Sequence, residues 1–408
     1  MIKSNKSLLF INHFAGIPGV NEQSLRQFYL AEDFISKGID VTIVCSQNHY
    51  NVSVKNKFPN YKTVNIKNVN YIFVNEPFFS RINLFTKLIG MFYFSLNLYY
   101  SLFIRKIVSA KKIDIVYSSS PDIISSFVGS IYAKYVKAKH ILEIRDIWPL
   151  SQIVHHGFSK YHPIILLLSF FEKKTYMNSE SIISTCHKFD KYLKEKNIDK
   201  PFLFIPHLTK IKTNNNKLSF PEKLKNYQTV GIYAGTIGKF YNLESLVNNF
   251  PSKYKNQIGV LLVGGGDNYN NIKNLIKEKK LDNFYITPRI SYDKLLEYYN
   301  YADFAITKLP INCDKLYKYG INQLKAADYM INKLPVLFIG NNNFINIDKK
   351  NLYLCKSESI KSYNNVFSEI ANTTKDRLSF IGEQNFNYVL ENNDIKINSK
   401  KIRTFINI

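Results

Sequence analysis

Two runs of alternating strand-like and helix-like segments, separated by a polar stretch, are the sequence feature that most restricts the fold. In the first run, short apolar segments such as Ser7–Asn12 and Asp40–Cys45 flank a longer segment of helical spacing, Glu22–Lys37. Strands that alternate with helices pair in parallel, because the helix carries the chain back before the next strand begins. Further strands are predicted at Tyr71–Val74, Ile113–Ser118 and His140–Ile144.

The polar stretch Ile211–Lys225 contains three consecutive asparagines and a proline, which is typical of a linker. The alternation resumes after it. Strands are predicted at Thr229–Ala234, Gly259–Val263, Phe284–Ile286, Phe304–Thr307 and Pro335–Ile339, and helices at Leu243–Asn249, Asn270–Lys279, Tyr292–Tyr299 and Gln323–Ile331. We therefore predict an α/β fold of two tandem Rossmann-like domains, 1–210 and 226–390, with a linker at 211–225. Residues 391–408 are expected to form a tail that packs back on the first domain. Two such domains would face each other across a cleft, where ligands bind at the C-terminal ends of the strands.

Composition restricts the function classes. Hydrophobic residues make up 45% of the 408 residues, which excludes a disordered chain. The formal net charge of +24 favours an anionic partner: nucleic acid, anionic lipid or phosphorylated substrates. The cations are mostly dispersed lysines, so nucleic acid ranks last.

The cysteines form no CxxC pair and the histidines show no metal spacing, so we expect no metal and a reduced, cytoplasmic setting. Among the histidines, His13 is the one worth testing because of its loop.

The segment Leu88–Ile104 is uncharged and rich in Phe, Tyr and Leu, with Lys87 before it and Arg105 after it. It lies at the lower edge of the length that spans a membrane, and Asn97 argues against a spanning segment. Two interpretations remain open. The segment is either a core helix of the first domain, or an interfacial helix anchored by tyrosines and flanked by cations that attract anionic lipid.

The strongest candidate site is the stretch Tyr319–Pro335. Gly320 allows a tight turn, and Asn322 is a good N-cap for the helix that follows. A helix start of this kind offers free N–H groups to a phosphate. Lys325 and Asp328 are three residues apart, so they share a face near that end. The ammonium would neutralise phosphate and the carboxylate would accept ribose hydroxyls, unless the two form an ordinary surface ion pair.

This stretch resembles the family 4 glycosyltransferases of the GT-B fold, in the branch that makes bacterial surface polysaccharides such as O-antigen and capsule. The branch pattern GxSPxKxxDYMxxxxPV is matched at Gly320, Lys325, Asp328, Tyr329, Met330, Pro335 and Val336. Asn322 and Gln323 replace its serine and proline. The resemblance implies that Asp328 contacts the donor ribose. The first acid of the family's Glu-x7-Glu motif falls on Gly320, so the usual carboxylate contact to the donor sugar is unassigned.

Two further blocks in the second half resemble the family in the same order. Tyr233–Lys239 is similar to the strand and loop that open its second domain. The resemblance implies that Gly235 lets the backbone approach the pyrophosphate and that Lys239 binds phosphate. Arg289 falls in the family's base-binding loop, where it lies against the base or is simply solvated. Gly264–Gly266 resembles the family's G-x-G, for which we favour a structural role.

In the first half, Glu143–Pro149 is similar to the branch's E-x-R-D-x-W-P block. Charged residues at the end of an apolar strand are costly unless they are paired or exposed in a cleft. Asp146 is the best candidate for a catalytic residue, and Glu143 and Arg145 are candidates for a supporting pair, with a structural ion pair as the alternative for Glu143. Gly19 matches the family's N-terminal glycine loop, which approaches the phosphates and the acceptor; Gly16 and Arg26 match that loop and the helix after it.

The resemblance implies a retaining glycosyltransferase of the hexosyl- or N-acetylhexosaminyltransferase class, with a UDP-linked sugar donor and no metal or other cofactor. Its acceptor would be a growing, lipid-linked oligosaccharide. The expected location is cytoplasmic, peripheral on the inner face of the cytoplasmic membrane, whose anionic surface suits the net charge. A UDP-sugar 2-epimerase on the same fold is the alternative, followed by a basic membrane- or nucleic-acid-binding protein without catalysis. The donor sugar, the acceptor and the oligomeric state are not specified by the sequence.

Overall fold

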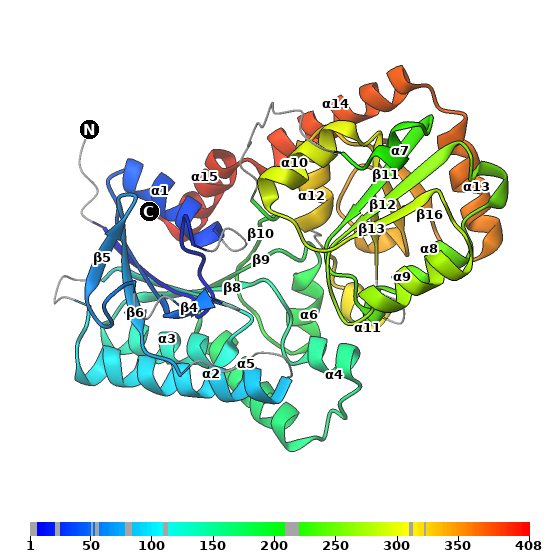
Figure 1. The fold of residues 1–408 in the computed structure, drawn as a ribbon. Helices are drawn as coiled ribbons and strands as arrows, with labels where there is room; N and C mark the ends of the chain where they lie inside the picture. The colour runs from blue at the N-terminus through cyan, green and yellow to red at the C-terminus, as the bar shows by residue number, and fades with distance from the viewer. Residues whose placement is uncertain are drawn as a thin grey trace. The chain divides into compact units, whose positions relative to one another are not determined.

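The chain divides into two compact units, each with its own sheet. The computed structural model describes residues 6–20, 25–49, 52–53, 57–77, 84–108, 113–208, 220–309, 313–321 and 324–408. The first unit contains Met1–Leu208 and Ile395–Ile408, and the second contains Thr209–Asp394. Both are of the α/β class, with helices on the two faces of a mainly parallel sheet (Figure 1).

The sheet of the first unit has eight strands in the order β10-β9-β8-β7-β1-β2-β6-β5. Neighbouring strands are parallel except β5, which runs antiparallel to β6. The strands are β1 (Ser7–Ile11), β2 (Asp40–Ser46), β5 (Thr63–Ile66), β6 (Val69–Val74), β7 (Ile115–Ser119), β8 (Lys139–Ile144), β9 (Ser181–Ser184) and β10 (Phe202–Phe204); β3 (Asn48–His49) and β4 (Val52–Ser53) form a separate pair. The strand order reverses at β1, so the loop after β1 lies at a topological switch point.

Alternate residues of β1 pack against the helices on opposite faces of the sheet. Leu8 and Phe10 belong to the core beneath α1 and α15, whereas Leu9 and Ile11 pack toward α2 and α3. The C-terminal helix α15 lies beside α1 (Figure 1), and its Arg403 forms an ion pair with Asp33 of α1. The helices of this unit are α1 (Arg26–Ser36), α2 (Leu84–Tyr99), the π-helical turn η2 (Tyr100–Ile104), α3 (Ile123–Tyr135), α4 (Leu150–His156), α5 (Pro163–Asn178), α6 (Phe189–Glu195) and α15 (Ile395–Ile406).

The sheet of the second unit is parallel throughout, in the order β13-β12-β11-β14-β15-β16. Its strands are β11 (Thr229–Ala234), β12 (Ile258–Val263), β13 (Phe284–Thr287), β14 (Phe304–Lys308), β15 (Val336–Ile339) and β16 (Leu352–Cys355). Its helices are α7 (Glu222–Lys225), η3 (Lys239–Tyr241), α8 (Leu243–Asn248), η4 (Ser252–Tyr254), α9 (Tyr269–Glu278), α10 (Tyr292–Tyr301), α11 (Asp314–Tyr317), α12 (Leu324–Ile331), η5 (Asn342–Phe344), η6 (Lys349–Asn351), α13 (Ile360–Ala371) and α14 (Lys375–Asn393). The order reverses between β11 and β14, which places the loop after β11 at the switch point of this unit.

Every strand predicted from the sequence is present, with ends that differ by at most two residues. The predicted first helix begins at Arg26, and residues 21–24 before it lie outside the described residues. Within the predicted linker, Glu222–Lys225 form the short helix α7 with Leu224 buried, and residues 209–219 are likewise outside the described part.

The uncharged segment Leu88–Ile104 spans most of α2 and the whole of η2. One side of it enters the core of the first unit through Met91, Phe94 and Leu98, whereas the other side is exposed. It is therefore a core helix on one side only. No helix in the described part of the chain has both the length and the apolar character needed to cross a membrane.

Candidate active site

The loop that follows β11 is shaped around the side chain of Lys325. Gly235 has a φ of +150°, and a Cβ added there would lie 2.3 Å from Cε and 2.6 Å from Nζ of Lys325. The neighbouring loop is equally close, since a Cβ on Gly264 would lie 1.8 Å from the carbonyl oxygen of Gly235. Only glycine tolerates both the backbone conformation and the close approach. The glycines therefore bring the lysine side chain to the C-terminal end of β11.

The ammonium of Lys325 is held by tyrosines. Its Nζ donates a hydrogen bond of 2.9 Å to the Tyr233 hydroxyl and lies 4.5 Å and 4.3 Å from the ring centroids of Tyr233 and Tyr241. Burial lowers the pKa of Lys325 to about 8. Among the residues that the structure describes, no carboxylate lies within ion-pair distance of this ammonium. A desolvated cation without a counter-charge, at a switch point, is suited to bind an anion.

Asp328, one turn further along α12, is held by two other tyrosines. Its carboxylate oxygens accept hydrogen bonds of 2.6 Å from Tyr292 and 2.8 Å from Tyr299, both on α10. Burial, and then the charge of Asp328, raise the pKa of Tyr299, so its hydroxyl remains a donor. The two phenols therefore fix the position of the Asp328 carboxylate on α12. Lys325 and Asp328 contact different elements and do not form the ordinary surface ion pair that was the alternative.

Tyr329 fixes α12 to the end of β11. Its hydroxyl donates a hydrogen bond of 3.0 Å to the carbonyl of Ala234 and accepts one of 2.9 Å from the N–H of the same residue. Both backbone groups are buried, and a buried backbone group without a partner costs about 1–3 kcal/mol. A phenol supplies donor and acceptor together. These two hydrogen bonds account for the tyrosine next to Asp328 without any role in ligand binding.

The remaining predicted donor residues are more exposed. Lys239 begins η3, where its backbone N–H donates to Asp267 and its side chain is exposed. Arg289 is exposed in the loop after β13. Asn322 lies outside the described residues. The structure thus brings Gly235 and Lys325 into contact and places Asp328 on the same helix, whereas Arg289 has no contact with this group.

A buried ion pair that the sequence did not reveal supports the same loop. Lys308, at the end of β14, is fully buried and pairs with Glu358, and burial lowers the pKa of this lysine. The second oxygen of Glu358 accepts a hydrogen bond of 2.6 Å from Asn242. Asn242 has a φ of +47° and closes the turn η3 that carries Tyr241. The pair therefore holds the turn that covers Lys325. The only feature of the sequence that indicates this ion pair is a lysine at the end of an apolar run.

In the first unit, Asp146 is fixed at the end of β8. Its Oδ2 accepts hydrogen bonds of 2.8 Å from the Trp148 indole and 3.3 Å from the Ser151 hydroxyl. The Ser120 hydroxyl accepts the backbone N–H groups of Arg145 and Asp146 at 2.8 Å and 3.2 Å. The half-buried carboxylate is thus rigidly held, and the tryptophan of the block acts as its orienting donor.

Glu143 lies deeper in the first unit and is completely buried. The sequence suggested Arg145 as its partner, but its ion pair, at 2.7 Å, is with Arg26. Its oxygens also accept hydrogen bonds from Gln27, Ser119 and Tyr117. Burial would raise the pKa of Glu143, but the charges of Arg26 and Arg145 hold it below its ordinary value. A buried carboxylate with this many donors positions α1 against the sheet, and its catalytic role stays a prediction.

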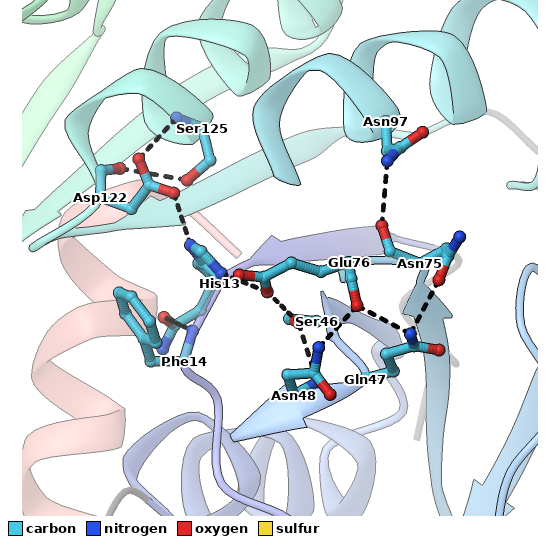
Figure 2. Close-up of polar contacts among 11 residues, drawn as sticks. His13, Phe14, Ser46, Gln47, Asn48, Asn75, Glu76, Asn97, Asp122 and Ser125 are labelled. Atoms are coloured by element: carbon cyan, nitrogen blue, oxygen red, sulfur yellow. Dashed lines mark hydrogen bonds and ion pairs between the residues drawn. The ribbon is translucent and has the colours of Figure 1, made fainter. Parts of the chain in front are cut away.

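Gly19 lies in the loop after β1, with a φ of +76° and open space around its Cα. At the start of this loop His13 sits in a buried cage (Figure 2). Its Nδ1 lies 2.7 Å from Asp122 and its Nε2 lies 2.8 Å from Glu76. The rings of Phe14 and Phe94 stack on its two faces, each 4.1 Å away between centroids.

The two carboxylates of this cage tie three segments together. Asp122 caps α3 by accepting the N–H groups of Ile124 and Ser125, and Glu76 accepts a hydrogen bond from Ser46 at the end of β2 (Figure 2). Burial opposes a charged imidazole, but Glu76 and Asp122 raise the pKa of His13 above its ordinary value. Asp122 and Glu76 were missed in the sequence because they lie far from His13 along the chain.

Comparison with known proteins assigns the second unit. Residues 214–384 match the family model described as glycosyl transferases group 1. The second unit is therefore similar in sequence to the group 1 glycosyl transferases. The predicted enzyme class, a glycosyltransferase, is thereby confirmed. No curated protein sequence matches the chain.

Solved structures with the same fold span nearly the whole chain. The sucrose-phosphate synthase of Thermosynechococcus elongatus aligns with a TM-score of 0.70 at 16% identity, covering 99% of this chain and 98% of that one. A glycosyltransferase from Rickettsia africae ESF-5 aligns with a TM-score of 0.61 at 16% identity, covering 99% of each chain. Anabaena HepE in complex with UDP gives a TM-score of 0.65 at 12% identity, covering 98% of this chain and 99% of that one. The predicted fold, two tandem Rossmann-like α/β domains of the GT-B type, is confirmed.

Proposed function

We propose that this glycosyltransferase moves a sugar from a UDP-linked donor to a growing glycan, with retention of configuration. The main support for this donor assignment is the ammonium of Lys325. Tyrosine rings and a hydroxyl surround it, and no carboxylate among the described residues lies beside it. The pyrophosphate of a nucleoside diphosphate supplies the missing negative charge. Anabaena HepE, which has the same fold, has been solved in complex with UDP and with UDP-glucose, which supports UDP as the nucleotide.

The chemistry assigned to the second unit is stabilisation of the leaving diphosphate. Negative charge grows on that group as the glycosidic bond to the donor breaks, and fixed cations stabilise it there. We assign this part to Lys325, assisted by Lys239, and the reaction then needs no metal. Asp328 would accept a hydrogen bond from a ribose hydroxyl, with its carboxylate positioned by Tyr292 and Tyr299. Arg289 would lie against the base.

We assign the acceptor to the first unit. Asp146, held by Trp148 and Ser151, is the group we propose to stabilise the reacting centre or to orient the acceptor hydroxyl. Gly19 lies in the loop after β1, at the switch point of that sheet, and we propose that this loop approaches the donor phosphates and the acceptor. The acceptor proposed is a lipid-linked oligosaccharide of a surface polysaccharide such as O-antigen or capsule, met at the inner face of the cytoplasmic membrane.

The donor assignment is tested by titrating UDP and GDP calorimetrically into the wild-type chain, Lys325→Met and Lys361→Met. Methionine keeps the length of Lys325 and removes its charge, and Lys361 is an exposed control on α13. A charge-assisted hydrogen bond contributes about 1.5–3 kcal/mol, so we expect Lys325→Met to bind UDP roughly tenfold to a hundredfold more weakly. Equal affinity in all three proteins would remove Lys325 from the donor site.

The reaction itself is tested by screening UDP- and GDP-sugars for nucleotide release, with and without lipid-linked acceptors. Acceptor-dependent release of UDP, with the anomeric configuration of the product retained by NMR, is the expected result. Conversion of a UDP-N-acetylhexosamine to its 2-epimer without acceptor would support the epimerase instead. Turnover that persists after chelation supports the metal-independent mechanism.

A further inference from the structure

The helix formed by α2 and η2 is apolar on the side that faces away from its own core. Six large side chains on this side are exposed: Phe85, Ile89, Tyr93, Leu96, Tyr100 and Ile104. They recur every three or four residues, so they form one stripe along the helix. A helix that covers a water-soluble core normally carries polar residues on its outer side. Here both sides are apolar, which requires a second apolar environment.

The neighbouring helix α5 continues this surface. It exposes Leu166, Leu167, Phe170 and Met177. The rings of Phe92 on α2 and Phe171 on α5 lie 6.4 Å apart between centroids, and both helices lie on the same side of the sheet of the first unit (Figure 1). We call the exposed stripes of α2, η2 and α5 together the α2–α5 face. Two adjacent apolar stripes make a patch of the kind that marks an interaction site.

The charges on the α2–α5 face are all positive. Residues 84–108 contain no acidic residue, and the one acidic residue of α5, Glu172, is buried in an ion pair with Lys196. Exposed cations stand at the end of η2, at Arg105 and Lys106, and within the stripe of α5, at Lys173 and Lys174. An apolar surface with cations within it and at its end complements a partner that is apolar inside and anionic outside.

We propose that the α2–α5 face docks the first unit on a bilayer containing anionic phospholipid, with α2 and α5 lying in the headgroup region. Apolar side chains enter the acyl boundary, tyrosines sit at the interface, and cations contact lipid phosphates. A second copy of the chain fits the face less well, because two copies would bring like charges together without an acidic residue between them. The surface itself is independent of the donor site, and only its purpose, access to a lipid-linked acceptor, rests on the proposed function.

Co-sedimentation of the full chain with vesicles tests the apolar part. One set of vesicles contains phosphatidylcholine alone, and the other contains equal parts of phosphatidylcholine and phosphatidylglycerol. The variant Leu96→Ser/Phe170→Ser removes side chains that are 70% and 51% exposed, and Ile360→Ser/Phe380→Ser is a matched control at 64% and 49% on the second unit. Wild type and control should bind the anionic vesicles, and the face variant should bind at least about tenfold more weakly.

The charged part is tested with Lys173→Gln/Lys174→Gln against Lys277→Gln/Lys279→Gln, a pair exposed on the second unit. Each lysine removed from the face should weaken binding about fivefold at low salt, and the effect should fade as salt is added. The proposal is overturned if the wild type ignores anionic vesicles, if face and control variants bind alike, or if light scattering shows a dimer that Leu96→Ser/Phe170→Ser converts to a monomer. UDP titration of the same samples separates these outcomes from failure of the donor site, since the face variants should bind UDP as the wild type does.

Discussion

His13 and Lys325 are cations in equivalent places, and their surroundings differ in one respect. His13 follows β1, and the ammonium of Lys325, which is a residue of α12, lies at the end of β11; the order of each sheet reverses at these strands. His13 has a carboxylate on each ring nitrogen and an aromatic ring on each face. Lys325 has aromatic rings and a hydroxyl, and no carboxylate in the described part of the chain. A cation with its counter-charges already in place holds the backbone together, whereas a cation without them is ready for an anionic ligand.

The largest effect is expected where the counter-charges are complete. His13→Asn would leave Glu76 and Asp122 buried and facing each other without a cation. Breaking a buried ion pair in this way costs about 3–5 kcal/mol, so the first unit should lose that much stability in urea unfolding. His156→Asn, at an exposed histidine of α4, is the control. A loss below about 1 kcal/mol would mean that the cage around His13 does not hold the loop.

The corresponding substitution at Lys325 should lower the affinity for UDP without lowering the stability of the protein. Lys325→Met removes a desolvated charge that no carboxylate in the described residues compensates, so the stability of the ligand-free protein should stay equal or increase. The roughly tenfold to hundredfold loss of UDP affinity expected above should appear in the same sample. Urea unfolding and calorimetry together check this. Destabilisation comparable to that of His13→Asn would erase the distinction between the two sites.

A smaller effect is expected at Tyr329, whose hydroxyl joins α12 to the end of β11. Tyr329→Phe leaves the buried N–H and carbonyl of Ala234 without their partner, so we expect a loss of about 1–3 kcal/mol in unfolding free energy. UDP affinity should fall less than in Lys325→Met, because the charge of Lys325 is retained. Tyr301→Phe on α10 serves as a matched substitution.

The smallest expected effect is a dependence of UDP affinity and of stability on pH, which distinguishes Lys325 further from His13. The pKa of Lys325 is lowered to about 8, so each pH unit above that value lowers the charged fraction about tenfold and UDP affinity should fall with it. The ligand-free protein responds in the opposite direction. The unfolded lysine keeps its proton up to about pH 10.5, so this group makes the fold more stable as pH rises from about 8 to 10.5. Titrations between pH 7 and 9 should show the loss of affinity in wild type and a flat profile in Lys325→Met.

The sequence located the buried strands well because each is a short segment composed mainly of apolar residues. It missed β5, β10 and β16, which lie at the edges of their sheets, and the short strand β9. Edge strands alternate or are short, and β16 buries only every second residue. Such segments resemble loops in composition.

At the candidate site, the sequence indicated Gly235, Lys325 and Asp328 through a family resemblance, and the structure adds their surroundings. The tyrosines that hold the two charged groups come from β11, η3 and α10, segments separated by up to about a hundred residues from α12. Glu143 likewise takes its partner from α1 and not from its own block. Pairings of this kind follow from how the sheet brings chain segments together, and residue spacing along one segment does not encode them.

The lowered pKa of Lys325 also makes its amine more nucleophilic at neutral pH than that of an ordinary surface lysine. At neutral pH about a tenth of it is the free amine, whereas an ordinary surface lysine is almost fully protonated. An aldehyde that carries a phosphate would meet both a nucleophile and a place for its anion there. Selective imine formation at Lys325, which bound UDP would prevent, would then report whether the donor site is occupied without any assay of sugar transfer.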